Sequence, residues 1–466
     1  LQDGAWETAG SPPIPHGRQR NKAEIDDLLG ECTHDGVVDE DEVYARVGLV
    51  DRRRQGHKTV AWRAAHGTHV MDLACGHDPE EDCKTRPIVA VQLATRVTAD
   101  TSGTGEGGLL SPLITFPLSK ANQVFLAILY ILDCADRIGP NLPVVINLSY
   151  GLIAGPHDGK LALEAAIDTL IAWRKAKGGE LEVILPAGNN YLSRCHACVS
   201  FAKMKSVESL SWRIQPDDRT LSFMEVRLPS LPGTSTGSRL ALTLTPPGGT
   251  ESLPLEEIPG RQLEWKDSSG RTYAWAIYTV ESLPAPHAWF LIVVWPTASL
   301  DPSRAIAPAG RWTVKLYNER LSPAQPVHAW IQRDDSLYGF PRLGRQSYFE
   351  DERYRRFDHG GREIEDDAGN DPNCPIQRRG TINAIATGTS AIVAGSFVRR
   401  GGRLSSYSSA GVVAQGGAPA PSRSGPDMLV ASDDSLAHIG VLAAGSRSGS
   451  RVAMSGTSVA APLLAR

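Results

Sequence analysis

Apolar positions between residues 60 and 199 follow two alternating periods. One set of segments consists of short apolar runs, typical of strands buried on both faces of a parallel sheet; these runs are residues 88–94, 143–148 and 181–185. The other set has the period of a helix; these segments are residues 68–75, which end at Gly76, 122–138 and 160–177. The alternation predicts an α/β fold with a doubly wound, mostly parallel sheet.

The pattern changes near residue 200. From there to residue 335, proline and glycine separate short segments of alternating hydrophobicity: residues 221–228, 240–244, 272–280, 289–295, 311–317 and 328–332. Such spacing predicts an antiparallel β-sandwich. Residues 338–375 are charged and loop-like, and an α/β pattern returns in residues 381–387, 391–397, 405–411, 427–432 and 441–445. The sandwich is therefore expected to interrupt one α/β domain.

This interruption divides the chain into three expected parts. They are residues 1–199, the N-terminal part of the α/β domain with its core motifs in 61–199, residues 200–337, the inserted β-sandwich, and residues 338–466, the truncated C-terminal part. The first sixty residues are polar, and they contain two short predicted helices, 21–29 and 39–47, but no buried strand.

Composition is that of an ordinary globular protein, because 41% of the 466 residues are apolar and 21% are charged. The net charge of −4 gives no reason to propose a nucleic-acid or membrane-surface partner, and no apolar run approaches the length of a membrane span. The chain starts at Leu1 without a signal peptide and stops at Arg466 inside a predicted helix, so we expect both ends to be cut. Localisation and oligomeric state are left open.

Cysteines and tryptophans each have two interpretations. The seven cysteines are irregularly spaced, and Cys195-His196-Ala197-Cys198 is a lone CxxC pair without the two further ligands that zinc needs. A structural pair is favoured over a metal or redox role. Most of the tryptophans lie between Trp212 and Trp330. A packed aromatic core is favoured over a carbohydrate- or peptide-binding surface, although β-sandwiches serve both uses.

The strongest chemical signal is a serine near the end of the chain. It lies in the run Met454-Ser455-Gly456-Thr457-Ser458-Val459-Ala460-Ala461-Pro462. Small neighbours let the backbone turn tightly and leave the hydroxyl of Ser458 uncovered, and a helix N-terminus favours a developing negative charge. A nucleophilic serine needs both properties. A small-residue loop that enters a helix is the alternative.

Other stretches carry groups that such a serine needs. The run His66-Gly67-Thr68-His69-Val70 places His66 at the N-terminal edge of a predicted helix. A metal half-site made of His66 and His69 lacks a third ligand, and a structural histidine is the other alternative. Ser149-Tyr150-Gly151 and Gly188-Asn189 follow two predicted strands, at the end where such sheets gather functional groups.

These stretches together resemble the motifs of the subtilisin-like serine protease family (peptidase S8, the subtilases). The resemblance rests on residues 66–70 for the histidine motif, Pro186-Ala187-Gly188-Asn189 for the oxyanion asparagine and residues 455–462 for the serine motif, in the family's order. Tyr407-Ser408-Ser409-Ala410-Gly411 followed by Pro426-Asp427 also resembles the stretch before the serine. The resemblance covers residues 64–190 and 376–466, and three motifs in order are much more specific than one.

The resemblance implies a serine endopeptidase that acts on a protein or peptide substrate. Ser458 is then the nucleophile and His66 the general base, while Asn189 and the backbone N–H of Ser458 stabilise the oxyanion. Loss of such an asparagine costs about 10²–10³ in turnover in subtilisin.

The resemblance also implies the residues that bind substrate. Ser149, Tyr150, Gly151 and Gly188 would hold an extended peptide by β-addition, and His69 would be structural. No cofactor is required and no metal ligand is assigned; family members often bind structural calcium, but no ligand set for it stands out.

One member of the implied triad has no clear position. The family's order is Asp, His, Ser, and its Asp ends a buried strand, which nothing before Ala65 resembles. Val37-Val38-Asp39 is the nearest run, but Asp39 heads a predicted acidic helix. We expect the carboxylate upstream of Leu1, with Asp39 as the weaker candidate and Asp72 as no substitute. The chain as printed is expected to turn over weakly or not at all.

Two other functions stay open. A non-catalytic relative would use the β-sandwich as a binding module, but a binder has no use for Ser458, His66 and Asn189 together. An esterase or amidase would use similar chemistry, but the GxSxG elbow of the α/β-hydrolases is absent around Ser458.

Overall fold

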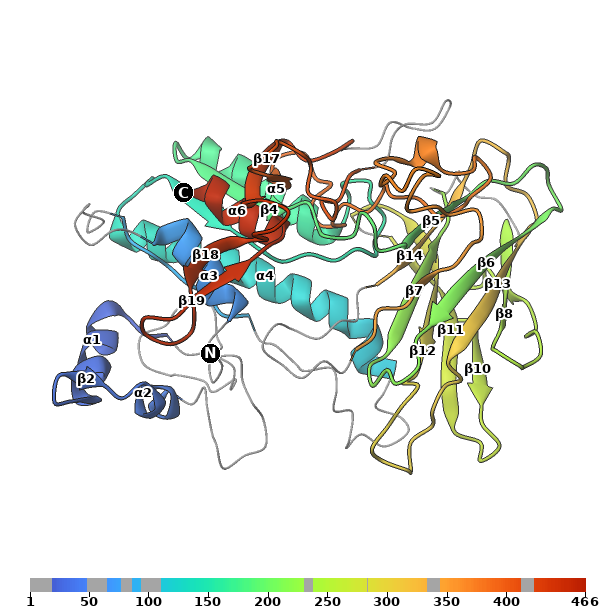
Figure 1. Ribbon diagram of the computed structural model, residues 1–466, viewed down its shortest axis with the longest axis horizontal. Helices are drawn as coiled ribbons and strands as arrows, with labels where there is room; N and C mark the ends of the chain where they lie inside the picture. Colours follow the sequence, from blue (N-terminus) through green and yellow to red (C-terminus); the bar gives the residue numbers. More distant parts are fainter. Residues whose placement is uncertain are drawn as a thin grey trace.

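The computed structural model describes residues 19–47, 65–76, 86–93, 110–229, 238–282, 284–332, 344–411 and 423–466. Figure 1 shows two regions: helices around a small sheet, and beside them a set of long antiparallel strands. None of the described helices is both long enough and apolar enough to cross a membrane.

Two short helices near the start of the chain confirm the prediction for residues 21–29 and 39–47. The elements are α1 (Lys22–Glu31), β1 (Thr33–His34), β2 (Val37–Val38) and α2 (Glu40–Arg46). Asn21 caps α1, because its Oδ1 accepts the N–H of Glu24 at 3.0 Å. Asp39 caps α2 in the same way, accepting the N–H of Glu42 at 3.0 Å.

A four-stranded parallel sheet forms the centre of the helical region. Its order is β17 (Met428–Asp433), β16 (Ile392–Val398), β4 (Leu181–Pro186), β3 (Val144–Asn147). The helices that follow or precede these strands are α3 (His66–Cys75), α4 (Leu110–Ile138), α5 (Ala162–Ala176) and α6 (Thr457–Ala465). The predicted α/β class, with a parallel sheet and antiparallel sheets, is confirmed.

Helices cover both faces of β4. Val183 and Leu185 pack in one core with residues of α4 and α5, whereas Ile184 packs with Ala460 and Ala461 of α6. Because neighbouring strand residues point to opposite faces, α6 lies on the face opposite α4 and α5. This burial explains why residues 181–185 read as one continuous apolar run.

Parts of the predicted α/β pattern differ from the structure. Residues 88–93 are in no strand, and Ile88 remains 52% exposed, because none of the described strands pairs with this run; Ala94 lies outside the described residues. Val145 is 50% exposed because β3 is an edge strand. Residues 381–387 and 405–411 are irregular, although the first stretch is buried.

Two antiparallel sheets make up the second region, and they contain all six strands predicted there. The strands are β5 (His196–Val199), β6 (Val207–Ile214), β7 (Ser222–Arg227), β8 (Leu240–Thr245), β9 (Leu255–Glu256), β10 (Gln262–Lys266), β11 (Thr272–Glu281), β12 (His287–Val294), β13 (Gly310–Asn318), β14 (Val327–Ile331) and β15 (Tyr348–Phe349). One sheet has the order β10-β11-β12-β7-β14-β5 and the other β15-β6-β13-β8-β9.

The two antiparallel sheets share one apolar core. It contains Trp212 and Trp312 from one sheet and Phe290 and Trp330 from the other, all buried. The predicted aromatic core is therefore confirmed for these tryptophans.

The chain returns from the antiparallel sheets close to where it entered them. Ala197 of β5 forms a β-bridge with Ile376, and the N–H of Gln377 donates to the carbonyl of His196 at 3.0 Å. The short helix η2 (Asp367–Gly369) precedes this return. The division at residues 199 and 337 stays a prediction.

A last hairpin joins the sheet to the C-terminal helix. It consists of β18 (Val441–Ala444) and β19 (Arg451–Met454). Helix α3 docks on β18 through two side chains: Nε2 of His69 donates to the carbonyl of Val441 at 2.9 Å, and Oδ2 of Asp72 accepts the N–H of Ala444 at 2.7 Å.

Three imidazoles stack around Trp330, and those of His157 and His196 are buried. The rings of His157, His196 and His328 lie 4.4, 4.8 and 5.3 Å from its ring. Nδ1 of His196 donates to the carbonyl of Arg379 at 2.5 Å, so its Nε2 accepts the Nδ1–H of His328 at 3.0 Å. Protonation of His196 would place two N–H groups face to face.

Burial keeps these imidazoles neutral. It lowers the pKa of His157 to about 3 and that of His328 to about 4, and it lowers the pKa of His196 well below its usual value.

We predict that acid weakens the fold through this stack. An unfolded imidazole binds a proton near pH 6.5 and the folded one does not, so the free energy of unfolding should fall between pH 6.5 and 4, by up to about 1.4 kcal/mol per pH unit for each imidazole. Glu164 titrates in the opposite sense, because burial raises its pKa to about 7, but three imidazoles outnumber it. Urea unfolding at pH 7.5 and pH 5 measures the slope.

His328→Gln is the matched variant for this prediction, since it removes one of the titrating rings. It should reduce the pH slope of the unfolding free energy. An unchanged slope would contradict the assignment to this stack.

Candidate active site

Ser458 and His66 are brought together from positions 392 residues apart. Oγ of Ser458 lies 2.8 Å from Nε2 of His66. Ser458 is the second residue of α6 and His66 the first residue of α3. The two helices share a small core that contains Leu73 and Val459, and this core sets the distance between the two side chains.

The surroundings of His66 favour its neutral form. Burial lowers its pKa, and the nearby His69 lowers it further. A neutral imidazole whose Nε2 carries no proton can accept the hydroxyl proton of Ser458. The pair can therefore act as a nucleophile and its base.

Asn189 lies beside the serine with a fixed amide orientation. Its Oδ1 accepts the N–H of Thr457 at 2.9 Å and the Oγ1–H of Thr457 at 3.0 Å, so the amide nitrogen Nδ2 is directed away from them. Neither Nδ2 nor the backbone N–H of Ser458 has an acceptor among the residues that the structure describes. Two unused donors next to a nucleophile can stabilise an oxyanion.

Gly456 allows the serine and the asparagine to approach each other. It has φ +136°, and a Cβ on it would lie 3.0 Å from Nδ2 of Asn189 and 3.4 Å from Oγ of Ser458. A side chain at this position would be strained and would fill the space beside the nucleophile.

The ends of β3 and β4 lie next to this pair. The N–H of Gly188 donates to Oγ1 of Thr457 at 2.9 Å. Tyr150 is largely buried, and burial raises its pKa to about 12, so it stays protonated. Contact of Ser149, Tyr150, Gly151 and Gly188 with a substrate stays a prediction.

Asn383 supports the strand ends and was missed by the sequence reasoning. Its backbone N–H donates to the carbonyl of Ala187, and its Nδ2 donates to the carbonyl of Pro186, both at 2.7 Å. A Cβ on Gly151 would lie only 2.1 Å from the same Nδ2, so Gly151 leaves room for this amide. The available signal was a lone polar residue in the apolar run 382–386.

Ser149 makes a second contact that the sequence reasoning missed. In a helix, the carbonyl of Ser458 would accept the N–H of residue 462, but Pro462 has no N–H. Oγ of Ser149 donates to this carbonyl at 2.8 Å instead. Ser149 therefore ties the end of β3 to the backbone of the serine itself.

The third member of the expected triad has no described counterpart. Within the described ranges, no carboxylate hydrogen-bonds to Nδ1 of His66. Asp39 caps α2 and Asp72 binds the backbone of β18, so each has another partner. A carboxylate upstream of Leu1 stays a prediction.

The CxxC pair has the surroundings of buried thiols. Sγ of Cys195 is 3.5 Å from the carbonyl oxygen of Ser193, and burial raises the pKa of Cys198 to about 11. Cys198 is therefore protonated at neutral pH, and a structural role for the pair stays a prediction.

Comparison with solved structures gives a fold relative. No family model matches the sequence, and no curated protein matches it significantly. The solved structure of the Clostridium perfringens CspB protease matches with a TM-score of 0.58 and 17% identity, over 94% of this chain and 73% of that chain. At this identity the match shows a common fold.

We predict that Ser149→Ala lowers the free energy of unfolding by about 1 kcal/mol, because it leaves the carbonyl of Ser458 without its donor. Pro462→Ala supplies an N–H at the position where a helix would provide one. In a double-mutant cycle measured by urea unfolding, Ser149→Ala should therefore cost less when Pro462→Ala is present. Equal costs in the two backgrounds would contradict this account.

Proposed function

We propose that this protein is a serine-type endopeptidase of the subtilisin-like class. The observation that carries the proposal is the 2.8 Å contact between Oγ of Ser458 and Nε2 of His66, next to the unused amide of Asn189. The fold shared with a solved protease structure supports it, and so does the order of the three sequence motifs.

The proposed reaction uses these groups in sequence. Oγ of Ser458 attacks the peptide carbonyl carbon while its proton passes to Nε2 of His66, and the carbonyl oxygen takes the negative charge. Nδ2 of Asn189 and the N–H of Ser458 donate to that oxygen. His66 then gives the proton to the leaving amine, and water releases the acyl group from Ser458 by the same steps.

The finer fold assignment belongs to the same proposal. The parallel sheet with α3, α5 and α6 would be the catalytic domain of a subtilisin-like protease, and the two antiparallel sheets would be a β-sandwich inserted in it. The return of the chain beside β5 supports this arrangement, since a unit inserted at a loop enters and leaves at neighbouring points.

One observation favours a second candidate, a non-catalytic relative that acts as a binding module. No carboxylate orients His66 within the described residues, and its loss costs about 10⁴ in turnover in serine proteases of this mechanism. Retention of a short Ser458–His66 contact and of the Asn189 amide favours the endopeptidase.

Labelling with a serine-directed fluorophosphonate tests the proposal. We expect the folded protein to be labelled at Ser458 and Ser458→Ala to be unlabelled. Ser455→Ala is the matched control, because Ser455 is exposed in the same run and should not affect labelling. A folded full-length protein that resists the reagent would refute the endopeptidase and leave the binding module.

The pH dependence of labelling reports the base. Burial and His69 lower the pKa of His66. His66 therefore stays mostly neutral at pH 6.5, and the rate of labelling should fall to half its maximum at a pH below 6.5. An orienting carboxylate would raise this pKa instead. A midpoint at or above pH 6.5 would therefore contradict the environment described for His66.

A further inference from the structure

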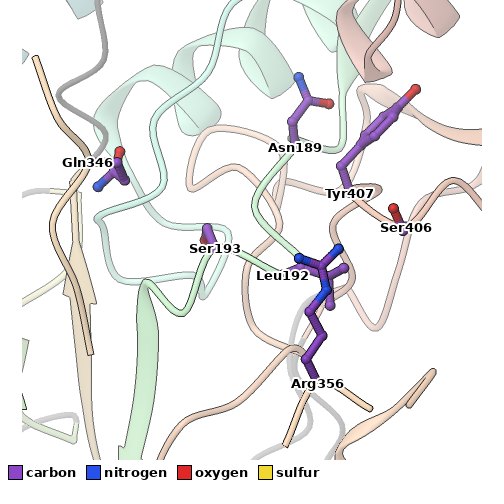
Figure 2. A pocket seen from close by; sticks show the side chains of 7 residues that line it. All are labelled: Asn189, Leu192, Ser193, Gln346, Arg356, Ser406 and Tyr407. Carbon is purple, nitrogen blue, oxygen red and sulfur yellow. The ribbon is translucent and has the colours of Figure 1, made fainter. Parts of the chain in front are cut away.

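Asn189 lines a cavity of about 240 Å³. Leu192 and Ser193 line it from the segment after β4, and Ser406 and Tyr407 line it from the segment after β16. The remaining walls are Gln346 and Arg356 (Figure 2). Neither Gln346 nor Arg356 belongs to the sequence motifs that carry the proposed function.

The two segments that form the floor of the cavity are held together by backbone hydrogen bonds. The N–H of Tyr191 donates to the carbonyl of Tyr407 at 3.2 Å, and the N–H of Ser409 donates to the carbonyl of Gly188 at 3.0 Å. The floor is therefore connected to the strand end that carries Asn189, and it is fixed before a ligand binds.

Arg356 is the charged group in this lining, which contains no carboxylate. Figure 2 shows its side chain extending from the backbone towards Asn189 and Tyr407. Nε of Arg356 donates to Glu363 at 3.3 Å. The two terminal nitrogens carry four more N–H groups, and these donate no hydrogen bond to the residues that the structure describes. The guanidinium lies over the ring of Phe357, 5.3 Å from its centroid.

A small hairpin fixes the backbone of Arg356. The N–H of Ile364 donates to its carbonyl at 2.9 Å, and Phe357 forms a β-bridge with Glu363. The guanidinium is thus presented on a structured segment. Its side chain is 56% exposed, so a ligand can reach it from solvent.

Two of the three hydroxyls in the lining are already committed as donors, whereas Oγ of Ser406 donates to no residue that the structure describes. Oγ of Ser193 donates to the carbonyl of Asn190 at 2.7 Å, and the hydroxyl of Tyr407 donates to Asp433 at 2.6 Å. The guanidinium is therefore the cationic donor of the lining, beside the amide of Asn189 and Oγ of Ser406. A planar guanidinium with free N–H groups fits a carboxylate through two parallel hydrogen bonds.

We propose that this cavity binds a carboxylate of the peptide substrate through Arg356. The inference rests on the proposed function, because it takes Asn189 as the position of the reacting carbonyl. An extended chain advances about 3.3–3.6 Å per residue, so the carboxylate belongs to a residue within one or two positions of the bond that is cleaved. It is supplied by an acidic side chain or by the free C-terminus of a short peptide.

Peptide binding to the Ser458→Ala protein tests the proposal without requiring catalysis. The probes are alanine-based octapeptides with a single Glu or Gln at each position in turn, made with a free or an amidated C-terminus, and binding is measured by calorimetry. We expect one position at which Glu binds roughly fivefold to tenfold more tightly than Gln. If tighter binding depends on the free C-terminus and not on the position of Glu, the end of the peptide supplies the carboxylate.

Substitutions test whether Arg356 causes the preference for Glu over Gln. Arg356→Gln should abolish it, and Glu363→Gln should increase it, because Glu363 competes for the same guanidinium. Arg355→Gln is the matched control, since the Arg355 side chain contacts His359 at 3.1 Å and is not part of the lining; it should leave the preference unchanged.

Each result has a defined meaning. A preference that survives Arg356→Gln, the absence of any preference, or no binding by any peptide of the series overturns the proposal. Labelling of Ser458 together with an absent preference overturns the cavity assignment alone. An Arg356-dependent preference without labelling keeps the cavity as a carboxylate site and overturns the endopeptidase.

Discussion

The contact between Ser458 and His66 is the constraint that organises this molecule. A hydrogen bond of 2.8 Å must be held between the first turns of two helices that are 392 residues apart. Apolar contacts of Leu73 and Val459 bring α3 and α6 together. Polar contacts of His69 and Asp72 then fix α3 on the hairpin that leads into α6. The parallel sheet supplies a rigid base for α6.

The parts of this arrangement that could be predicted depend on local sequence. Helix α2 begins after Asp39 because an aspartate caps it, and six strands of the antiparallel sheets follow from alternating hydrophobicity. Ser458, His66 and Asn189 were found because their neighbours are small residues or strand ends, and such neighbours indicate exposed functional groups. The structure places these three residues together.

The parts that could not be predicted depend on pairing between distant segments. Ser149 bonds the carbonyl of Ser458 because Pro462 lacks an N–H, and Asn383 fills the space left by Gly151. β9 and β15 have two residues each, too few to show alternation. Residues 88–93 have an apolar pattern, but a strand also needs a neighbour to pair with. Arg356 lies in residues 338–375, whose charged sequence predicts only a loop.

The return of the chain beside β5 has a consequence for folding. β4 and β16 are neighbours in the sheet, yet about two hundred residues separate them, and the free energy of closing a loop rises by about 0.6 kcal/mol with each doubling of its length. The bridge between Ala197 and Ile376 reduces the open length to about 25 residues. Three doublings are removed, so formation of the antiparallel sheets lowers the entropic cost of joining β4 to β16 by about 2 kcal/mol.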